Sequence, residues 1–506
     1  MTPRLPSARG RLLEQPELVP VFIGVLLLVV RSVLNFGNSL WIDETITAWL
    51  VSGSPWEVVV RTTEFQGQSP LYFFAPWVAT HLFGMHEWAL RLPSLVSNLI
   101  TVAALFGFFK ALAGKDIAGY GAGTFAVIAS CSPQLQVARP YALAICCFSL
   151  SLFFFVGWAL SSKRSMLVCF ALSISGVIYS HYLFALGFPL IALLWLLLGK
   201  RSILGLKDIG AAVVVCTILA LPAGWQLHIL MSKTSLYSFS PRPSLNSWAQ
   251  TISIEYFSIC AISVVALLLA AKLIPSIKDS CDYFRPLLLA ISLWIYPSLA
   301  LMAISIVANC PVLVQRYSMY SIIGESLLQG IVLCLVAKVK IRRFIFLGAS
   351  AVAIVTSPPK LFFGEDWRGA LRDIPRSTGE PSIILLWTGL IETKDQTWVL
   401  SPLRRQYLLA PLSLYPVGVP SSPLALLPHL VQPGAIFTES DRRTVDDAKR
   451  IFVVLRTTTP FAKKFATNNP LLKSPWLDPR GTLVKRSSKS YEGLQVIELE
   501  RVEPGT

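Results

Sequence analysis

The chain has 506 residues, of which 54% are hydrophobic and only 14% are charged, and its formal net charge is +16. Soluble domains carry closer to ~25% charged residues, so this composition excludes an ordinary soluble protein. The positive charge does not indicate nucleic-acid binding, because the Lys and Arg residues lie mostly in short gaps between apolar runs.

The apolar runs predict a polytopic α-helical membrane protein. They are roughly 16–23 residues long, which is sufficient for spanning helices, and they lack the alternation of β-barrel strands. About eleven spans of this kind are expected. They cover residues 19–36, 89–109, 119–137, 140–160, 165–180, 182–199, 208–226, 253–273, 287–308, 317–337 and 343–357.

The basic residues set the orientation of these spans. With the N-terminus inside and the run 69–85 left out, every strongly basic gap falls on the cytoplasmic side, as the positive-inside rule requires. The run 69–85, which contains Pro76 and His81, is therefore expected to form a juxtamembrane or re-entrant helix on the outer side. The retained first helix and the absence of a disulfide framework suit a bacterial inner membrane.

The C-terminal part predicts a small α/β domain on the outer side. Short β-like runs occur at 383–386, 451–455 and 494–499, and polar stretches that can form helices lie between them. The expected domains are a cytoplasmic tail at 1–18, a transmembrane domain at 19–360 with its first outer loop and juxtamembrane helices at 37–88, and an extracytoplasmic domain at 361–506.

Two adjacent carboxylates, Asp43 and Glu44, follow directly after the first span. Acidic side chains at a bilayer are costly and indicate a functional site by default. One interpretation is a helix start, with Asp43 as the N-cap and Glu44 placed favourably on the helix dipole. The other is that Asp43 is a general base that accepts a proton from an acceptor hydroxyl.

The predicted outer face holds few cations, and each needs a local reason to be there. The candidates for holding an anionic ligand are Arg139, Arg316, Lys233 and Arg242. Arg suits phosphate because its planar fork binds in a bidentate manner and stays charged. The alternative for the two arginines at span boundaries is anchoring at the membrane interface. Aromatic and His side chains that we expect to contact substrate are Trp41, Tyr141, His181, Tyr182 and Tyr317.

Seven outer segments occur in an order that resembles a known family. They are Leu40-Trp41-Ile42-Asp43-Glu44, Ser69-Pro70-Leu71-Tyr72, Ala89-Leu90-Arg91-Leu92-Pro93-Ser94, Ala138-Arg139-Pro140-Tyr141-Ala142-Leu143, Ser180-His181-Tyr182, Arg316-Tyr317 and Glu365-Asp366-Trp367-Arg368. Across residues 19–370 this set resembles the GT-C superfamily of membrane glycosyltransferases. The closer resemblance is to its polyprenyl-phosphate-sugar-dependent branch, which includes protein O-mannosyltransferases and the lipid A aminoarabinose transferase.

The resemblance implies the chemistry of the site. Asp43 would be the catalytic aspartate, and Glu44 would assist it or help to bind a divalent cation such as Mg²⁺ or Mn²⁺. The donor would be an undecaprenyl- or dolichyl-phosphate sugar, and the acceptor a hydroxyl of a lipid, polysaccharide or protein. Many relatives have His-Pro-Pro where this chain has Gln68-Ser69-Pro70, and Glu64 is the candidate substitute for the missing metal or phosphate ligand.

Two other functions are compatible with a polytopic membrane protein. A transporter or flippase of a lipid-linked or anionic solute would place ionisable residues near mid-span and break helices at matching positions in two halves. A non-catalytic envelope scaffold would need neither the adjacent carboxylates nor the boundary arginines. The sequence favours the transferase over both.

Overall fold

The computed structural model describes residues 17–66, 68–232, 243–252, 254–270, 283–309, 311–357, 364–374, 380–390, 401–415, 417, 424–425, 439–458, 477–478 and 481–502. The chain forms two compact units. The helical unit contains residues 1–36, 62–76 and 91–359, and the sheet unit contains residues 37–61, 77–90 and 360–506. The predicted domain boundaries stay a prediction, although parts of the first outer loop belong to the same compact unit as the C-terminal residues.

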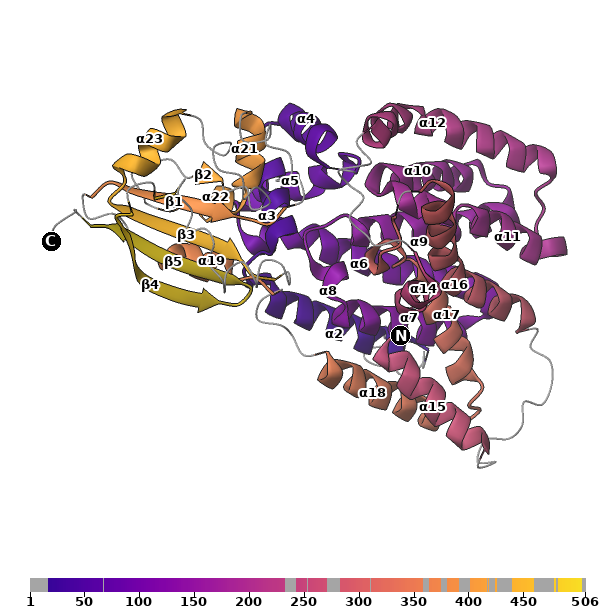
Figure 1. The fold of residues 1–506 in the computed structure, drawn as a ribbon. Coiled ribbons are helices and arrows are strands. Elements are labelled where there is room, and N and C mark those ends of the chain that lie inside the picture. Colours follow the sequence, from indigo (N-terminus) through magenta and orange to yellow (C-terminus); the bar gives the residue numbers. More distant parts are fainter. Residues whose placement is uncertain are drawn as a thin grey trace, which may run out of the picture. The chain divides into compact units, whose positions relative to one another are not determined.

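Helices of widely different length make up the helical unit (Figure 1). They are α2 (Leu18–Phe36), most of α6 (Glu87–Ala113), α7 (Lys115–Cys131), α8 (Pro133–Gln136), α9 (Tyr141–Ser161), α10 (Arg164–Ser180), η1 (Tyr182–Gly187), α11 (Pro189–Leu198), η2 (Gly199–Arg201), α12 (Leu206–Ser232), α14 (Leu245–Thr251), α15 (Tyr256–Ala270), α16 (Phe284–Val307), η3 (Gln315–Tyr317), α17 (Ser321–Cys334) and α18 (Val339–Thr356).

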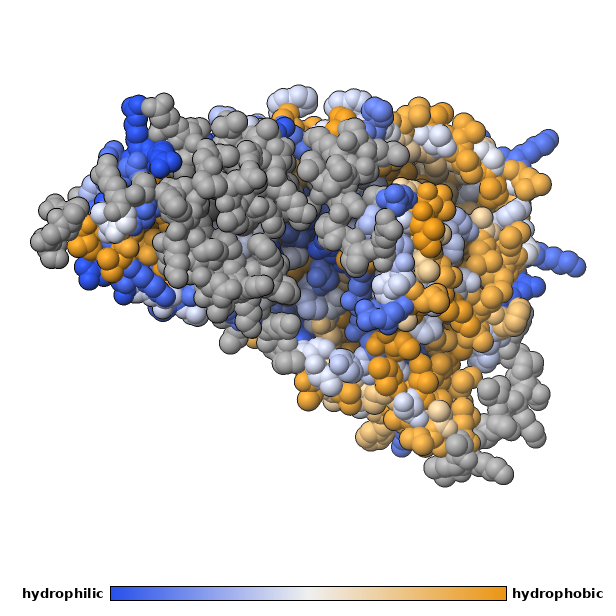
Figure 2. Space-filling view, viewed as in Figure 1, coloured by the Kyte–Doolittle hydropathy of each residue, from blue (hydrophilic) through white to orange (hydrophobic). Residues whose placement is uncertain are grey.

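The helical membrane architecture that the sequence predicts is confirmed. Within the described ranges, six helices are long and apolar enough to cross a membrane, or seven if the bent pair of α14 and α15 forms one span. The expected number of about eleven is not confirmed, because several predicted runs form shorter helices, such as α17 with 14 residues. Hydrophobic side chains cover much of the visible surface of the helical unit in Figure 2, as a lipid-facing surface requires.

The run 69–85 forms the short helix α5 (Leu71–Phe83). Its 13 residues give a length of roughly 20 Å at 1.5 Å per residue. The hydrocarbon core of a bilayer is about 30 Å thick. The helix is therefore too short to cross alone, in agreement with the juxtamembrane or re-entrant helix expected from the charge distribution.

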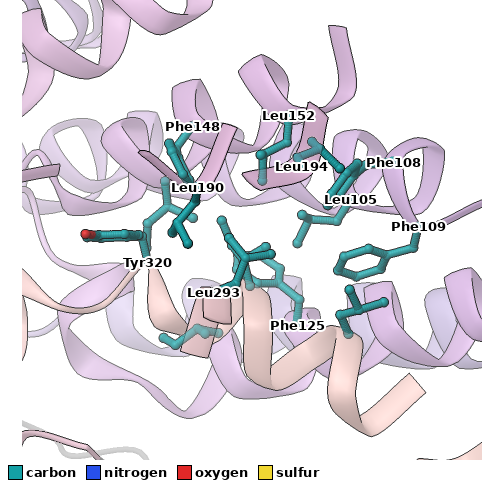
Figure 3. Close-up of a cluster of buried hydrophobic side chains, with 14 of the residues drawn as sticks. Leu105, Phe108, Phe109, Phe125, Phe148, Leu152, Leu190, Leu194, Leu293 and Tyr320 are labelled. Carbon is teal, nitrogen blue, oxygen red and sulfur yellow. The ribbon is translucent and has the colours of Figure 1, made fainter. Parts of the chain in front are cut away.

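Large apolar side chains from many helices fill the core of the helical unit. Figure 3 shows Phe108, Phe125, Phe148, Leu190 and Leu293 among them, and all are nearly or fully buried. Two helices, α2 and α7, approach more closely than such side chains would allow. A Cβ on Gly123 would collide with the backbone of Pro20, so small residues permit this packing, as is usual between membrane helices.

Charged side chains at both ends show that α2, α7 and α18 run in the same direction. Near the end of α2, Arg31 donates from Nε to the Ser130 carbonyl of α7 at 2.8 Å and from its guanidinium to the Ser357 carbonyl that closes α18. At the opposite end, Arg342 of α18 pairs with Asp116 of α7 at 2.8 Å. The predicted topology likewise has the first, third and last spans crossing in one direction.

The sheet unit combines a mixed sheet with short helices. Its elements are α3 (Ile42–Val51), most of α4 (Pro55–Phe65), part of α5, α19 (Trp367–Arg372), β1 (Ser382–Trp387), α21 (Pro402–Leu408), α22 (Pro411–Leu414), β2 (Leu424–Ala425), α23 (Glu439–Asp447), β3 (Arg450–Arg456), β4 (Leu483–Tyr491) and β5 (Leu494–Arg501). The strand order is β2-β1-β3-β5-β4. Strand β1 runs parallel to β2 and β3, and β5 is antiparallel to β3 and β4.

The three β-like runs of the sequence form β1, β3 and β5, so the predicted C-terminal α/β fold is confirmed. All six residues of β1 are buried, as expected for a central strand that reads as one apolar run. Strand β4 was not expected, because its residues from Val484 to Ser490 are polar or exposed. It is an edge strand that joins the sheet through its pairing with β5.

Candidate active site

The carboxylates of the first outer loop lie in the first turn of α3. The helix begins at Ile42 with Trp41 as its N-cap, so Asp43 and Glu44 are its second and third residues. The N-cap is therefore Trp41 and not Asp43, although acidic residues in a first turn do stabilise the helix dipole. Every residue of the helix except Asp43 is buried, so packing holds it on nearly all sides.

Asp43 and Glu44 face different environments, because successive helix residues do not share a face. Glu44 is completely buried, and its Oε2 accepts the Trp41 backbone N–H at 3.4 Å. Asp43 is partly exposed. Glu44 therefore helps to hold the start of the helix, and Asp43 is the more exposed of the two carboxylates.

Among the carboxylates predicted for a divalent cation, Asp43 and Glu44 lie in the same compact unit and Glu64 lies in the other. Glu44 is directed back to Trp41, and Glu64 belongs to the helical unit while Asp43 belongs to the sheet unit. Over the part of the chain that is described, no three His, Cys, Asp or Glu side chains are grouped to hold a metal ion. The cation stays a prediction.

A second group of predicted residues comes together in the helical unit. His181, between α10 and η1, lies with its ring centroid 5.6 Å from that of Tyr141, 5.3 Å from that of Tyr317 and 4.8 Å from that of Phe184. These residues come from three separate stretches of chain, at the start of α9, the end of α10 and in η3. The structure thus unites three of the five aromatic or His side chains predicted to contact substrate.

Two guanidinium groups act on this cluster. Burial, together with the charges of Arg139 and Arg316, lowers the pKa of His181 to about 3. Arg139 is itself buried and donates to Gln66 Oε1 at 3.4 Å, and Arg316 lies over the Tyr317 ring at 5.4 Å. His181 is therefore a neutral imidazole beside two fixed positive charges.

The His181 ring has unused hydrogen-bonding capacity. It is 3% exposed, and neither ring nitrogen has a hydrogen-bond partner among the described residues. Buried polar groups nearly always have partners, and a protein polar atom without one in the folded chain needs an explanation. A polar ligand that enters between the arginines would supply that partner.

The remaining predicted residues lie elsewhere or outside the described ranges. Tyr182 donates to Gln226 Oε1 of α12 at 2.5 Å, and Gln226 donates in turn to the Gln68 carbonyl at 2.8 Å. Trp41 is the N-cap of α3. Lys233 and Arg242 lie outside the described residues.

Sequence reasoning missed one buried carboxylate in a helix of the helical unit. Glu325 of α17 is 2% exposed, and its Oε1 accepts the Glu255 backbone N–H at 2.9 Å, at the start of α15. A lone Glu in the apolar run 317–337 was the available signal. Both Glu325 and Arg31 bind backbone groups at helix ends, so each has a structural explanation that requires no transported solute.

The sequence segment Asp366-Trp367-Arg368 forms the capped start of a short helix. Asp366 Oδ1 accepts the Gly369 N–H at 2.8 Å and caps α19. Arg368 forms an ion pair with Glu87 at 3.5 Å. The side chain before this segment, Glu365, is 2% exposed and contacts the start of α3, a role that no sequence pattern indicated.

Comparisons with known proteins place this geometry in a known fold. Residues 67–225 match the family model described as dolichyl-phosphate-mannose-protein mannosyltransferase. No curated protein sequence matches the chain.

Solved structures extend the likeness to nearly the whole chain. The structure of ArnT from Cupriavidus metallidurans in the apo state shares 13% identity with a TM-score of 0.53, covering 94% of this chain and 97% of that one. The same protein bound to undecaprenyl phosphate gives 12% identity and a TM-score of 0.54, covering 98% and 99%. The chain thus has the fold of ArnT, and the resemblance to the polyprenyl-phosphate-dependent GT-C glycosyltransferases that its sequence indicated is confirmed.

Proposed function

We propose that the protein is an inverting glycosyltransferase that moves a sugar from a polyprenyl-phosphate donor to a hydroxyl acceptor at the outer face of a bacterial inner membrane. Asp43 is its general base. The acceptor is a lipid, a polysaccharide or a protein that carries the hydroxyl. ArnT, whose fold the chain shares, has been solved with undecaprenyl phosphate, which is a product of the reaction we propose here when the donor carries that lipid.

The proposed reaction is a single displacement. The acceptor oxygen attacks the anomeric carbon from the face opposite the phosphate, while its proton passes to the Asp43 carboxylate. The bond between the anomeric carbon and the phosphate oxygen breaks, and polyprenyl phosphate leaves with the electron pair. One displacement inverts the configuration at the anomeric carbon. A positioned general base typically contributes about 10²–10⁴-fold to such a step.

The observation that carries the proposal is the charge at the His181 cluster. Arg139 and Arg316 both act electrostatically on one buried, neutral imidazole whose nitrogens have no hydrogen-bond partner in the described chain. Negative charge develops on the leaving phosphate, and guanidinium groups held in place before the reaction stabilise it most effectively. A phosphate also accepts several hydrogen bonds, which the imidazole N–H and the two guanidinium groups would donate.

The role of Asp43 as general base is tested with the purified protein in nanodiscs. The assay measures the release of polyprenyl phosphate from a radiolabelled polyprenyl-phosphate sugar. Asp43→Asn is expected to lose about 10²-fold or more in turnover. Glu57→Gln is a matched control, because Glu57 is an acidic residue of the same loop, is half exposed and forms an ion pair with its helix neighbour Arg61. Wild-type turnover in Asp43→Asn would refute the assignment.

Donor binding tests the arginines separately from the chemistry. Arg139→Ala and Arg316→Ala are each expected to weaken the binding of a polyprenyl-phosphate sugar about tenfold or more, since hydrogen bonds to charged groups contribute about 1.5–3 kcal/mol. Unchanged titrations in both variants would show that they only anchor the protein at the interface. Saturable donor binding by the wild type without any release would favour a transporter instead.

A further inference from the structure

Glu365, near the start of the C-terminal domain, contacts the helix that carries Asp43. We propose that Glu365 is the positioning residue for Asp43, and that the C-terminal sheet acts through it as part of the active-site framework. This inference rests on the proposed function, because it assigns a purpose to the placement of Asp43. All the contacts that support it lie within the sheet unit.

The Glu365 carboxylate is buried at the centre of four donors. Its Oε2 accepts the Ile42 backbone N–H at 2.9 Å and the Trp367 indole N–H at 2.8 Å. Its Oε1 accepts Arg456 Nε at 2.7 Å and the Thr458 hydroxyl at 3.4 Å. The side chain therefore links the start of α3 to the end of strand β3, where Arg456 lies 91 positions after Glu365.

The bond to Ile42 fixes the residue next to the proposed base. Ile42 is the first residue of α3, so its N–H is one of the amides that a helix cannot satisfy internally. A carboxylate is the strongest natural acceptor for such an amide, because it also interacts favourably with the helix dipole. Glu365 thus supplies from outside the cap that the Trp41 indole, a donor only, cannot provide.

The chain before Ile42 is held by the same part of the protein. The Leu40 N–H donates to the Tyr415 hydroxyl at 3.0 Å, and the Ser39 hydroxyl accepts the Arg368 backbone N–H at 3.1 Å. The Arg368 guanidinium also donates to the Gly37 carbonyl. Three successive contacts therefore fix residues 37–40 before the helix begins.

The body of α3 is held as well. Helix α22 packs against α3. The Trp49 ring of α3 meets the Tyr407 ring of α21 edge-on, with centroids 5.7 Å apart. Both ends of the helix are therefore set by the C-terminal domain, and Asp43 has little freedom to move independently of it.

Such constraint matters for a general base because catalysis depends on sub-ångström placement. A displacement of about 1 Å can cost roughly 10²-fold in rate. Replacing Glu365 with Gln keeps the shape but offers one acceptor oxygen where the carboxylate has two. One pair of donors then meets an amide NH₂, and the start of α3 loosens without loss of the Asp43 carboxylate.

The first measurement is hydrogen exchange at the α3 amides in Glu365→Gln, together with turnover and the donor KM. We expect faster exchange at Ile42, a fall in kcat of about tenfold or more, and an unchanged donor KM, because Glu365 does not touch donor. Tyr415→Phe, which keeps the ring but removes the acceptor of the Leu40 N–H, is expected to give the same pattern with a smaller fall. It also serves if Glu365→Gln fails to fold.

Glu380→Gln is the matched control. Glu380 is an acidic residue of the same sheet, at the start of β1, and pairs with Lys449 at 2.6 Å away from α3. It is expected to change neither exchange at Ile42 nor kcat. Unaltered kcat in both Glu365→Gln and Tyr415→Phe, or an equal fall in Glu380→Gln, would overturn the inference.

The double variant Asp43→Asn with Glu365→Gln separates this inference from the proposed function. If Glu365 acts through Asp43, the double variant turns over no more slowly than Asp43→Asn alone. Losses that multiply would overturn the positioning role and leave the base intact. Full activity of Asp43→Asn itself would overturn the proposed base and, with it, any positioning of that base.

Discussion

The buried ion pair between Glu365 and Arg456 makes a quantitative prediction about stability. The side chains are 2% and 14% exposed, and Oε1 and Nε lie 2.7 Å apart. Removing one member of a buried pair leaves an uncompensated charge and typically costs about 3–5 kcal/mol. Arg456→Met keeps most of the aliphatic stem but removes the charge and the 3.3 Å bond to the Thr388 carbonyl, so we expect the free energy of unfolding to fall by about that amount.

Thermal unfolding of purified protein, followed by intrinsic fluorescence, measures this effect. A change of 1 kcal/mol shifts Tm by about 2–4 °C in a unit of 150–250 residues, so Tm should fall by roughly 6 °C or more. The double variant Arg456→Met with Glu365→Gln removes the uncompensated charge and is expected to be more stable than Arg456→Met alone. A double variant that is less stable, by the sum of both single losses, would refute the reasoning.

Three further outcomes follow from charged groups in the helical unit. The pKa of His181 is about 3 in the folded protein against an ordinary 6.5, so below pH 6.5 the unfolded chain binds a proton that the folded chain does not. The free energy of unfolding therefore falls as the pH is lowered through 6.5. The loss between pH 7 and 5 is about 2 kcal/mol, and it should vanish in a pH series of Tm for His181→Gln. Arg31→Met is expected to lower stability by about 3 kcal/mol, since it removes charged donors from two helix ends, and a Tm equal to wild type would contradict this. Asp116→Asn removes the ion pair between Asp116 and Arg342 and should lower the free energy of unfolding by less than about 1 kcal/mol, because the Asp116 side chain is 59% exposed. A fall in Tm that corresponds to a larger loss would show that the buried Arg342 side chain needs the Asp116 charge.

The sequence was sufficient to predict those helices and strands that a local run of apolar residues indicates. Apolar runs revealed the membrane helices, and runs such as Ile451–Leu455 revealed the buried strands, because burial leaves a direct trace in composition. The His181 cluster was also predictable in part, since Tyr141 and Tyr317 lie at the starts of predicted spans and His181 lies between two spans, all at the predicted outer face. Because successive spans cross in opposite directions, every second connection between them lies at the same face of the membrane.

Other features depend on contacts that no local pattern records. The predicted role of Glu44 in catalysis stays a prediction, whereas its complete burial and its contact with the Trp41 N–H at the helix start could not be read from its neighbours in the sequence. The polar strand β4 has no apolar face, so only its pairing with β5 reveals it. Glu365 lies 323 positions from Ile42, and nothing in either segment specifies the other. The number of spans was uncertain for a similar reason, because tertiary packing sets where a long apolar run stops being helical.

That sequence separation has a consequence for the order of synthesis. Residues 37–42 emerge early, whereas Glu365, Arg368 and Tyr415 emerge only after the helices between them have been made. A nascent or prematurely terminated chain that ends before Glu365 therefore holds the whole first loop but lacks Glu365, Arg368 and Tyr415, which bind residues 37–42. Under the role assigned to Glu365, such a fragment would insert in the membrane with Asp43 loosely held, so the placement of the proposed base depends on completion of the chain.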